Sequence, residues 1–109
     1  MLVDVPILAR CYRAWPAESM QLKAWDHVLL AGRETKELRQ EELDRGRMLM
    51  RCFEQINGDN PEAAYRPLSF VCAYSLAAWS FRLGLRSAAH AYLWSCLKAR
   101  SWRAFASFR

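Results

Sequence analysis

The stretch from Gly32 to Ile56 has the clearest pattern of hydrophobic and polar positions in the chain. Its first half consists mostly of charged residues that interleave at helical spacing. In its second half the apolar positions recur every three or four residues, which is the spacing of an amphipathic helix. We therefore predict one long helix whose apolar stripe contains Leu43, Gly46, Leu49, Met50, Cys52, Phe53 and Ile56. The side chains that we expect to be buried are Leu38, Leu43, Leu49, Met50 and Phe53.

The charged half of this segment predicts ion pairs along the helix surface. Opposite charges lie three or four residues apart, and each such pair contributes only ~0.2–0.5 kcal/mol. A face of this kind is usually solvated, so the charge pattern alone does not indicate a binding site. The expected pairs are Glu41 with Arg45, Arg39 with Glu42, and Asp44 with Arg47.

Gly46 lies on the apolar stripe of this predicted helix. Glycine costs about 1 kcal/mol relative to alanine in a helix interior. We therefore expect another helix to cross close to Gly46, where a side chain would not fit. The alternative is a glycine whose cost no contact compensates.

Two shorter amphipathic segments precede the long helix. The first covers Val3–Trp15, with Asp4 as the expected N-cap and Pro6 in the first turn. The second begins at Ser19, or at the acidic residue before it, and continues to residue 30. Gly32 comes next, and it is compatible either with a break between two helices or with one long bent helix.

The second half of the chain predicts two more helices. Residues 57–61 have the composition of a loop, and the Asn-Gly pair there favours a left-handed helix end. Residues 68–83 are apolar on most sides, so we expect this helix to be central or to be covered by a partner. Gly84 is its expected C-cap, and Ser87 is expected to open a last helix that ends near Leu97. Because no segment alternates like a strand, the predicted fold is all-α, with about four to five helices in one compact domain.

Composition agrees with a single folded domain. The chain has 109 residues, of which 53% are hydrophobic and 25% are charged, and a chain of this size buries about two thirds of its unfolded surface. No apolar run reaches the roughly 18–20 residues that a membrane span needs. The first fifteen residues also lack the pattern of a signal peptide. We therefore expect a cytoplasmic protein.

Few residues have a pattern that indicates catalysis or metal binding. His27 and His90 stand alone in the sequence, without flanking carboxylates. We find no glycine-rich phosphate loop, no nucleophile elbow and no paired carboxylates outside the ion-paired helix. We therefore expect no enzymatic activity, no metal site and no intrinsic cofactor. Since no two cysteines form C-x-x-C, we expect buried free thiols at Cys11, Cys52, Cys72 and Cys96.

The net charge of +5 leaves other functions open. The unmatched basic residues collect in the last quarter of the chain, which ends in SCLKARSWRAFASFR. Basic and aromatic residues mixed in this way can bind phosphates and stack on bases, and they also resemble a helix that lies on a membrane surface. A basic helical nucleic-acid-binding module is therefore one alternative function, and a helical structural subunit of another complex is a second.

The most specific signal is a literal string within the charged segment, RETKELR. This string resembles the RET-x-ELR signature of UreF, the urease accessory protein family. Its surroundings match the family over a longer segment, and further segments match in the same order, so that the resemblance covers about residues 3–95. These segments are VPILARCYRAW, WDHVLLAGRETKELR, GRMLMR, PLSFVCAYSLAAW and AYLWS.

The resemblance implies an all-helical, usually dimeric cytoplasmic protein that is not itself catalytic. It also implies a complex with UreD, also called UreH, and with the GTPase UreG, which together deliver nickel to apo-urease. Within the motif, we expect Arg33 and Glu34 to form a partly buried polar network between the second and third helices. The family-motif residues that we assign to interactions are Arg33, Glu34, Thr35, Glu37, Leu38, Arg39, Gly46, Tyr92 and Trp94.

The resemblance breaks near both ends of the chain. Family members are longer and begin with a segment that contains a G-F-S-Y-S-type motif, which is absent here. After the equivalent of Ser95 they continue as an apolar helix toward a P-L-G-Q motif, whereas this chain becomes basic and aromatic. We therefore expect residues 1–95 to be a partial, N-terminally truncated UreF-like domain and residues 96–109 to be a tail foreign to the family. With suitable codons KARSWRAFASFR gives ESPVLAGVRQFP one nucleotide out of phase, so we expect a frameshift near Cys96.

Overall fold

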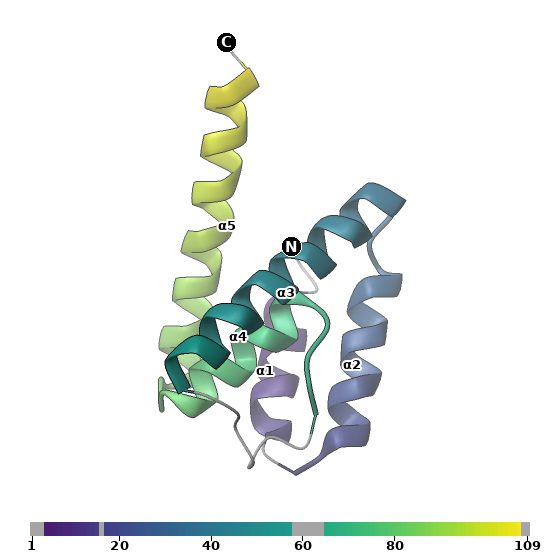
Figure 1. Cartoon of the computed structure of the whole chain (residues 1–109), viewed down its shortest axis with the longest axis vertical. Coiled ribbons are helices and arrows are strands. Elements are labelled where there is room, and N and C mark those ends of the chain that lie inside the picture. Colours follow the sequence, from purple (N-terminus) through teal and green to yellow (C-terminus); the bar gives the residue numbers. More distant parts are fainter. Residues whose placement is uncertain (1–3, 16, 58–64, 108–109) are drawn as a thin grey trace.

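The described residues of the protein form five helices, seen here in a computed structural model (Figure 1). The structure describes residues 4–15, 17–57 and 65–107, and it describes side chains up to residue 98 except that of Asn57. Within these ranges every regular element is a helix, which confirms the all-α prediction. The helices are α1 (Asp4–Ala14), α2 (Ser19–Ala31), α3 (Lys36–Asn57), α4 (Phe70–Ser80) and α5 (Leu85–Ser107).

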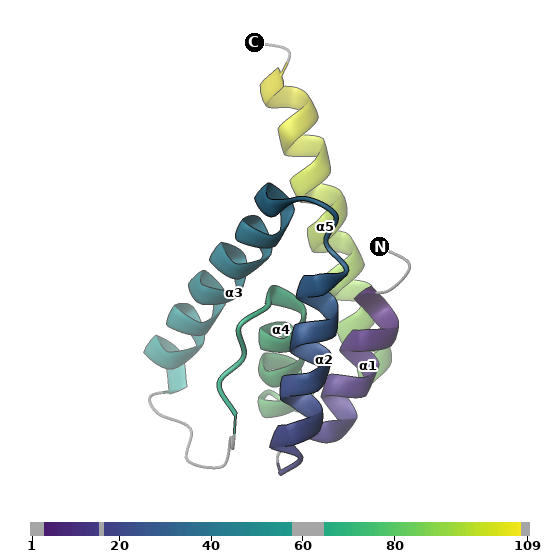
Figure 2. The same ribbon diagram turned by 90° about the vertical axis from the view of Figure 1, so that its right-hand side faces the viewer.

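Helix α4 is the central element of the fold. It packs against each of the other four helices, and Figure 2 shows it between α3 and the α1–α2 pair. This position explains why its sequence is apolar on most sides, and it confirms that the chain itself covers this helix. Its buried residues are Val71, Cys72, Ala73, Ser75, Leu76 and Ala78.

The core forms where α1, α2 and α3 meet α4. Helix α1 contributes the largest share, and its apolar residues follow helical spacing along the face toward α4. The indole of Trp15 also donates a hydrogen bond to Ser75 Oγ at 2.9 Å, which ties the end of α1 to the middle of α4. The buried apolar residues of the first three helices and of the turn after α1 are Ile7, Leu8, Cys11, Ala14, Trp15, Leu22, Leu29, Met50 and Phe53.

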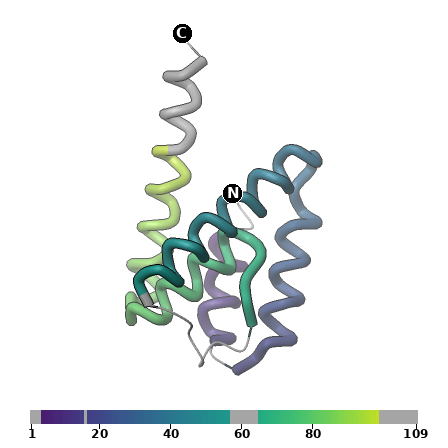
Figure 3. The backbone as a smooth tube through the Cα atoms, in the orientation of Figure 1, coloured from purple at the N-terminus to yellow at the C-terminus, as the bar shows by residue number. Residues whose placement is uncertain are grey.

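Helices α2 and α3 are separate, which settles the question that the sequence left open at Gly32. Gly32 ends α2 in a right-handed conformation, with φ of −75° and ψ of −11°. Thr35 then caps α3, because its Oγ1 accepts a hydrogen bond from the Leu38 backbone N–H at 3.1 Å. Arg33 and Glu34 therefore lie in the connection between the helices (Figure 3) and do not begin α3.

Burial along α3 follows the predicted stripe only in part. Met50 and Phe53 are buried, as predicted, while Leu43 and Leu49 are half-buried. The prediction was wrong for Leu38, which is 42% exposed. The reason is that the first turns of α3 extend beyond the start of α4, so nothing in α4 covers this face (Figures 1 and 2). At the far end of the stripe Cys52 and Ile56 are also exposed.

The charges of α3 pair differently from the simple helical spacing. Asp44 and Arg47 do form the expected pair, with a distance of 3.8 Å between Oδ1 and Nη1. Glu42 does not pair with Arg39, because its carboxylate is buried and binds Arg33 instead. Arg39 donates a hydrogen bond to the Arg33 backbone carbonyl at 3.0 Å.

Gly46 is where α3 approaches the start of α4 most closely. A Cβ atom built on Gly46 would lie 2.3 Å from the Leu68 carbonyl oxygen and 2.8 Å from the Ser69 carbonyl carbon. The close approach that the sequence predicts is therefore confirmed. It involves the extended segment before α4 and its capping turn, however, and not the body of a crossing helix.

We expect Gly46→Ala to destabilise the protein even though alanine is the better helix former. Propensity alone would stabilise the variant by about 1 kcal/mol. The added methyl group meets rigid backbone, and overpacking of this kind typically costs about 1–3 kcal/mol. Urea denaturation followed by circular dichroism would measure the loss. Gly84→Ala is the matched control, because a Cβ there meets nothing within 4 Å; a Gly46→Ala variant as stable as this control would contradict the close approach.

The turn between α4 and α5 corrects two further predictions. Helix α4 ends at Ser80, and the residue that adopts the left-handed conformation is Arg82, with φ of 58°, so Gly84 is not the C-cap. Helix α5 starts at Leu85, because the Ala88 N–H already donates to the Gly84 carbonyl, and Ser87 therefore lies in its first turn. Residues 96–107 continue α5 without a break, and the domain boundary expected after Ser95 stays a prediction. The predicted left-handed end at Asn57-Gly58 lies outside the described residues.

Candidate functional site

Arg33, the first residue of the motif string, holds two carboxylates from different helices. Its guanidinium donates to both carboxylate oxygens of Asp4, at 3.1 Å and 3.3 Å, which is the bidentate arrangement that suits arginine. Its Nη2 also donates to Glu42 Oε1 at 2.8 Å. Because Asp4 belongs to α1 and Glu42 to α3, one side chain in the α2–α3 connection joins both helices.

Two more hydrogen bonds extend this arrangement to α4 and α5. The Tyr92 hydroxyl of α5 donates to Asp4 Oδ2 at 2.8 Å. The Val71 backbone N–H, at the start of α4, donates to Glu42 Oε2 at 3.1 Å. We call Asp4, Arg33, Glu42 and Tyr92 the Arg33 network. It links α1, α3, α4 and α5 through groups that are largely shielded from water.

The charges of the network stabilise one another. Burial by itself would raise the pKa of the Asp4 carboxyl, but hydrogen bonds from Arg33 and Tyr92 and the charge of Arg33 outweigh burial and lower it. Burial likewise would lower the pKa of Arg33, and its two carboxylate partners raise it well above the ordinary value. Asp4 is therefore ionised at neutral pH, and its N-cap role is corrected: it is the first residue of α1 and its side chain binds Arg33 and Tyr92.

Tyr92 makes the network sensitive to alkaline pH. Burial, and then the hydrogen bond to Asp4, raise the pKa of its phenol well above the ordinary 10.0. A group whose pKa is raised in the folded state contributes stability that is complete below its unfolded pKa and is lost as the pH rises toward the folded value.

We therefore expect the free energy of unfolding to fall more steeply above pH 10 in the wild type than in Tyr92→Phe. Below that pH the phenol is neutral in both folded and unfolded states, so the difference between the two proteins should be constant. Urea denaturation at a series of pH values would measure both curves. Parallel curves across this range would contradict the buried Tyr92–Asp4 hydrogen bond.

A second buried carboxylate, Asp26 of α2, organises the start of α4. Its Oδ2 accepts from the Leu68 backbone N–H at 2.8 Å and from the Tyr65 hydroxyl at 2.7 Å. Its Oδ1 accepts from the Ser69 backbone N–H at 2.9 Å. We call Asp26, Tyr65, Leu68 and Ser69 the Asp26 cluster. The Ser69 Oγ also accepts a hydrogen bond from the Cys72 N–H, so the cluster satisfies the backbone N–H groups of Leu68, Ser69 and Cys72 around the start of α4.

The structure separates the predicted motif residues into two groups. Arg33, Thr35, Gly46 and Tyr92 build the fold, through the contacts described above. Glu34 does not join the predicted network: it is exposed and makes no hydrogen bond or ion pair with the described part of the chain. Thr35 is exposed although it caps α3, and the remaining motif residues are also exposed: Glu34, Glu37, Leu38, Arg39 and Trp94, which is 63% exposed.

Sequence reasoning missed the burial of three carboxylates in the described part of the chain, those of Asp4, Asp26 and Glu42. A usable signal was present, because each lies on the apolar stripe of its own helix. Asp26 is four residues after the buried Leu22 and three before the buried Leu29. A carboxylate at such a position is buried when the neighbouring apolar side chains pack. A buried carboxylate then needs a cation or hydrogen-bond donors as partners.

The described residues show no constellation for metal binding or nucleophilic chemistry. No three histidine, cysteine or acidic side chains among them are grouped to hold a metal ion. Every described buried side-chain nitrogen or oxygen also has a hydrogen-bond partner. Cys11 and Cys72 are buried, and the hydrogen bond between their side chains together with burial raises the pKa of the Cys72 thiol. Cys52, however, is exposed, which corrects the prediction that all four thiols are buried.

No helix in the described ranges is both long enough and apolar enough to cross a membrane. The chain matches the UreF family model over residues 1–100. No solved structure matches it.

Relatives of the chain carry the description urease accessory protein UreF. The one from Alkalilimnicola ehrlichii is 39% identical over 98 residues, which are 85% of this chain and 42% of that protein. The one from Hahella chejuensis is 34% identical over 97 residues, covering 87% and 44% of the two chains. The one from Alcanivorax borkumensis is 32% identical and covers 88% and 46%. The chain thus spans a little under half the length of these relatives, and it belongs to the UreF family.

Proposed function

We propose that this chain acts in the maturation of urease, as an accessory protein that assists nickel insertion into the apoenzyme. The observation that carries the proposal is the family match over residues 1–100, which includes the motif string and the residues of the Arg33 network. The relatives that support it are described as urease accessory proteins. The role is one of binding and assembly, and the chain is not an enzyme.

The partners that we propose are UreD, also called UreH, and the GTPase UreG, which together with this chain act on apo-urease. Nickel is handled by that complex, so the chain needs no cofactor of its own, and it works in the cytoplasm. We further propose that the complete protein is a homodimer. Nucleic acid and membranes are not among its partners.

The division of the motif residues suggests how the chain presents a surface to these partners. Arg33 fixes α1 and α3 relative to each other, and it does so from the connection that also carries the exposed Glu34. Glu37, Leu38 and Arg39 lie in the first turns of α3, directly after this connection, and are exposed as well. We propose that this exposed stretch contacts a partner and that the Arg33 network sets its position.

The proposal is tested by restoring urease activation. Cells that contain urease and all accessory proteins except their own UreF would express this chain, and ammonia release after nickel addition would measure activation. A tag on the chain would show whether UreD and UreG co-purify with it. Failure both to activate urease and to retain either partner would reject the proposal for this chain.

The contribution of Arg33 is tested in a full-length relative, at the position that aligns with Arg33. Lysine keeps the charge but loses the fork that binds Asp4 and Glu42 together. We expect the Arg→Lys variant to remain folded by circular dichroism and to lose most of its UreD and UreG co-purification and urease activation. Glu→Gln at the position of Glu34 is the control for a general effect of altered charge in the connection. If the lysine variant activates urease at the wild-type level, Arg33 contributes to stability alone and not to partner binding.

A further inference from the structure

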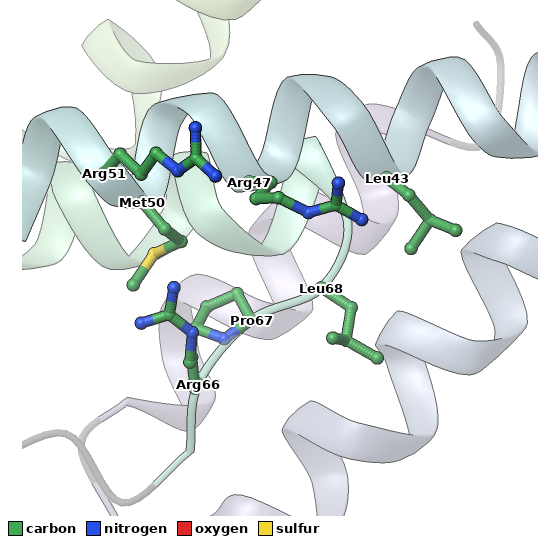
Figure 4. Close-up of a pocket in the computed structure, with 7 residues that line it drawn as sticks. All are labelled: Leu43, Arg47, Met50, Arg51, Arg66, Pro67 and Leu68. Atoms are coloured by element: carbon green, nitrogen blue, oxygen red, sulfur yellow. The ribbon is translucent and has the colours of Figure 1, made fainter.

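A hollow of about 260 Å³ lies between α3 and the extended segment that leads into α4. Figure 4 shows the α3 side chains on one wall and the residues before α4 on the other, with the Met50 side chain between them. None of the residues that line this hollow belongs to the Arg33 network. It is lined by Leu43, Arg47, Met50, Arg51, Arg66, Pro67 and Leu68.

The charged residues that line this hollow are all basic, although two of them have an acidic neighbour. Three of its lining residues are arginines and none is acidic. Arg47 has only a long contact to Asp44, at 3.8 Å, in which both side chains are more than half exposed. Arg66 pairs with Glu54. Arg51 is exposed and makes no hydrogen bond or ion pair with the residues that the structure describes, so its guanidinium has its donors available.

The floor of the hollow is apolar. Met50 is 5% exposed and Pro67 is buried, whereas Leu68 is 46% exposed and presents its side chain to the hollow. A ligand that fits this lining has an apolar group for the floor and negative charge for the rim. The volume is below the roughly 300–1,000 Å³ typical of small-molecule and cofactor sites, and it is better matched to a side chain than to a nucleotide.

Phosphate is a poor candidate for the negative charge. Phosphate sites commonly use the free backbone N–H groups at a helix start, and the start of α4 lies beside this hollow. Four of those donors are already bound within the chain: Leu68 and Ser69 to Asp26, Val71 to Glu42, and Cys72 to Ser69. The guanidinium groups are therefore the main donors left for an anion, and their planar forks suit carboxylates well.

We propose that this hollow docks an acidic segment of a protein partner, in which an apolar side chain is flanked by carboxylates. The apolar side chain contacts Met50, Pro67 and Leu68, and the flanking carboxylates bind Arg47, Arg51 and Arg66. A pocket that takes one anchoring side chain within a charged rim is typical of a protein-protein hot spot. The proposal concerns the chemistry of the partner segment and does not depend on the role in urease maturation.

The test uses the purified chain and short fluorescent peptides with blocked ends. In the first peptide a single Leu is flanked by Glu, in the second the Glu residues are replaced by Gln, and in the third the Leu is replaced by Ser. Fluorescence polarisation would measure the dissociation constant of each. We expect only the Glu–Leu peptide to bind well, and we expect Arg51→Gln to weaken it about tenfold, the effect of losing a charge-assisted hydrogen bond.

Two further variants separate docking from general attraction to a basic protein. Arg13→Gln removes another exposed arginine, from α1, a helix on the side of α4 opposite to α3 (Figure 2), and should leave binding unchanged. Leu68→Ser should weaken the Glu–Leu peptide while keeping the backbone hydrogen bond to Asp26. Thermal melting would verify that each variant is folded.

Several results would overturn the proposal. Equal binding of the Glu–Leu and Glu–Ser peptides would mean that charge alone attracts them. Equal weakening by Arg51→Gln and Arg13→Gln would mean that binding is not localised to the hollow. Absence of measurable binding by the Glu–Leu peptide would also reject the proposal. Displacement of that peptide by inorganic phosphate at the same ionic strength would reject it as well, because the hollow would then be a general anion site.

Discussion

Asp26→Ala is expected to be the most destabilising of the substitutions considered, although Asp26 lies outside the recognised motif string. The fully buried carboxylate accepts hydrogen bonds from two backbone N–H groups and from the Tyr65 hydroxyl. Alanine would leave these donors without partners, and each buried unsatisfied donor costs about 1–3 kcal/mol. A total of about 3–9 kcal/mol would consume much of the roughly 5–15 kcal/mol by which a typical domain is stable.

Urea denaturation of the wild type and the variant would measure this loss. Asp26→Asn keeps one carbonyl acceptor of the same shape but replaces the second acceptor with donors, so we expect it to be intermediate in stability. Glu34→Ala is the control, because an exposed side chain of this kind changes stability by no more than about 0.5 kcal/mol. An Asp26→Ala variant within that margin of the wild type would show that the start of α4 does not depend on the carboxylate.

The helices themselves could be predicted because their patterns are local. The stripe of α3 and the nearly all-apolar character of α4 follow from the spacing of side chains in a helix, and the structure agrees with the second in full and with the first around Met50 and Phe53. The predicted helix ends were less accurate, because the end of a helix depends on which residue caps it. Thr35 caps α3, which begins at Lys36 although the predicted stretch starts at Gly32, and Arg82 takes the left-handed conformation near the end of α4, where Gly84 was the expected C-cap. Both outcomes depend on contacts across turns that periodicity does not report.

Sequence analysis predicted Arg33, the central residue of the candidate site, but not the two carboxylates that bind it. Arg33 was expected to bridge two neighbouring helices with Glu34, and it does bridge helices, but through Asp4 and Glu42. Glu42 is nine residues away and Asp4 twenty-nine, so the pairing follows from the tertiary fold and not from the helical spacing of α3. Adjacent residues of the motif thus have different roles: Arg33 lies inside the domain, and Glu34 lies on its surface.

The different roles of these residues also explain why a motif of charged residues can be characteristic of a fold. The Arg33 network and the Asp26 cluster both end on backbone groups at the start of α4, at Val71 in one case and at Leu68 and Ser69 in the other. The close approach of Gly46 to the same segment completes the arrangement. Polar contacts from α2 and α3 therefore fix where the central helix begins, and the apolar core fixes how it packs.

Arg33→Ala is expected to destabilise the protein by an amount that depends on pH. Removing the arginine leaves Asp4 and Glu42 buried without their cation, and breaking a buried pair in this way costs about 3–5 kcal/mol. In the wild type the pKa of Asp4 is lowered from its ordinary 3.8. A group with a lowered folded pKa contributes stability that is present above its unfolded pKa and is lost as the pH falls through the folded value.

The difference in stability between the wild type and Arg33→Ala should therefore be complete at neutral pH, begin to shrink as the pH falls through the pKa that Asp4 has in the folded variant, and keep shrinking below 3.8 until Asp4 of the wild type is also protonated. Without Arg33, burial dominates the Asp4 carboxyl, so its pKa rises and protonation at low pH relieves the unpaired charge. Free energies of unfolding from urea titrations between neutral and acidic pH would measure this convergence. Asp4→Asn in the Arg33→Ala background is the matched control, since it should recover part of the loss at neutral pH by removing one of the two uncompensated charges. A deficit that is constant across the pH range, with no recovery in the double variant, would mean that Arg33 acts through packing and not through its carboxylate partners.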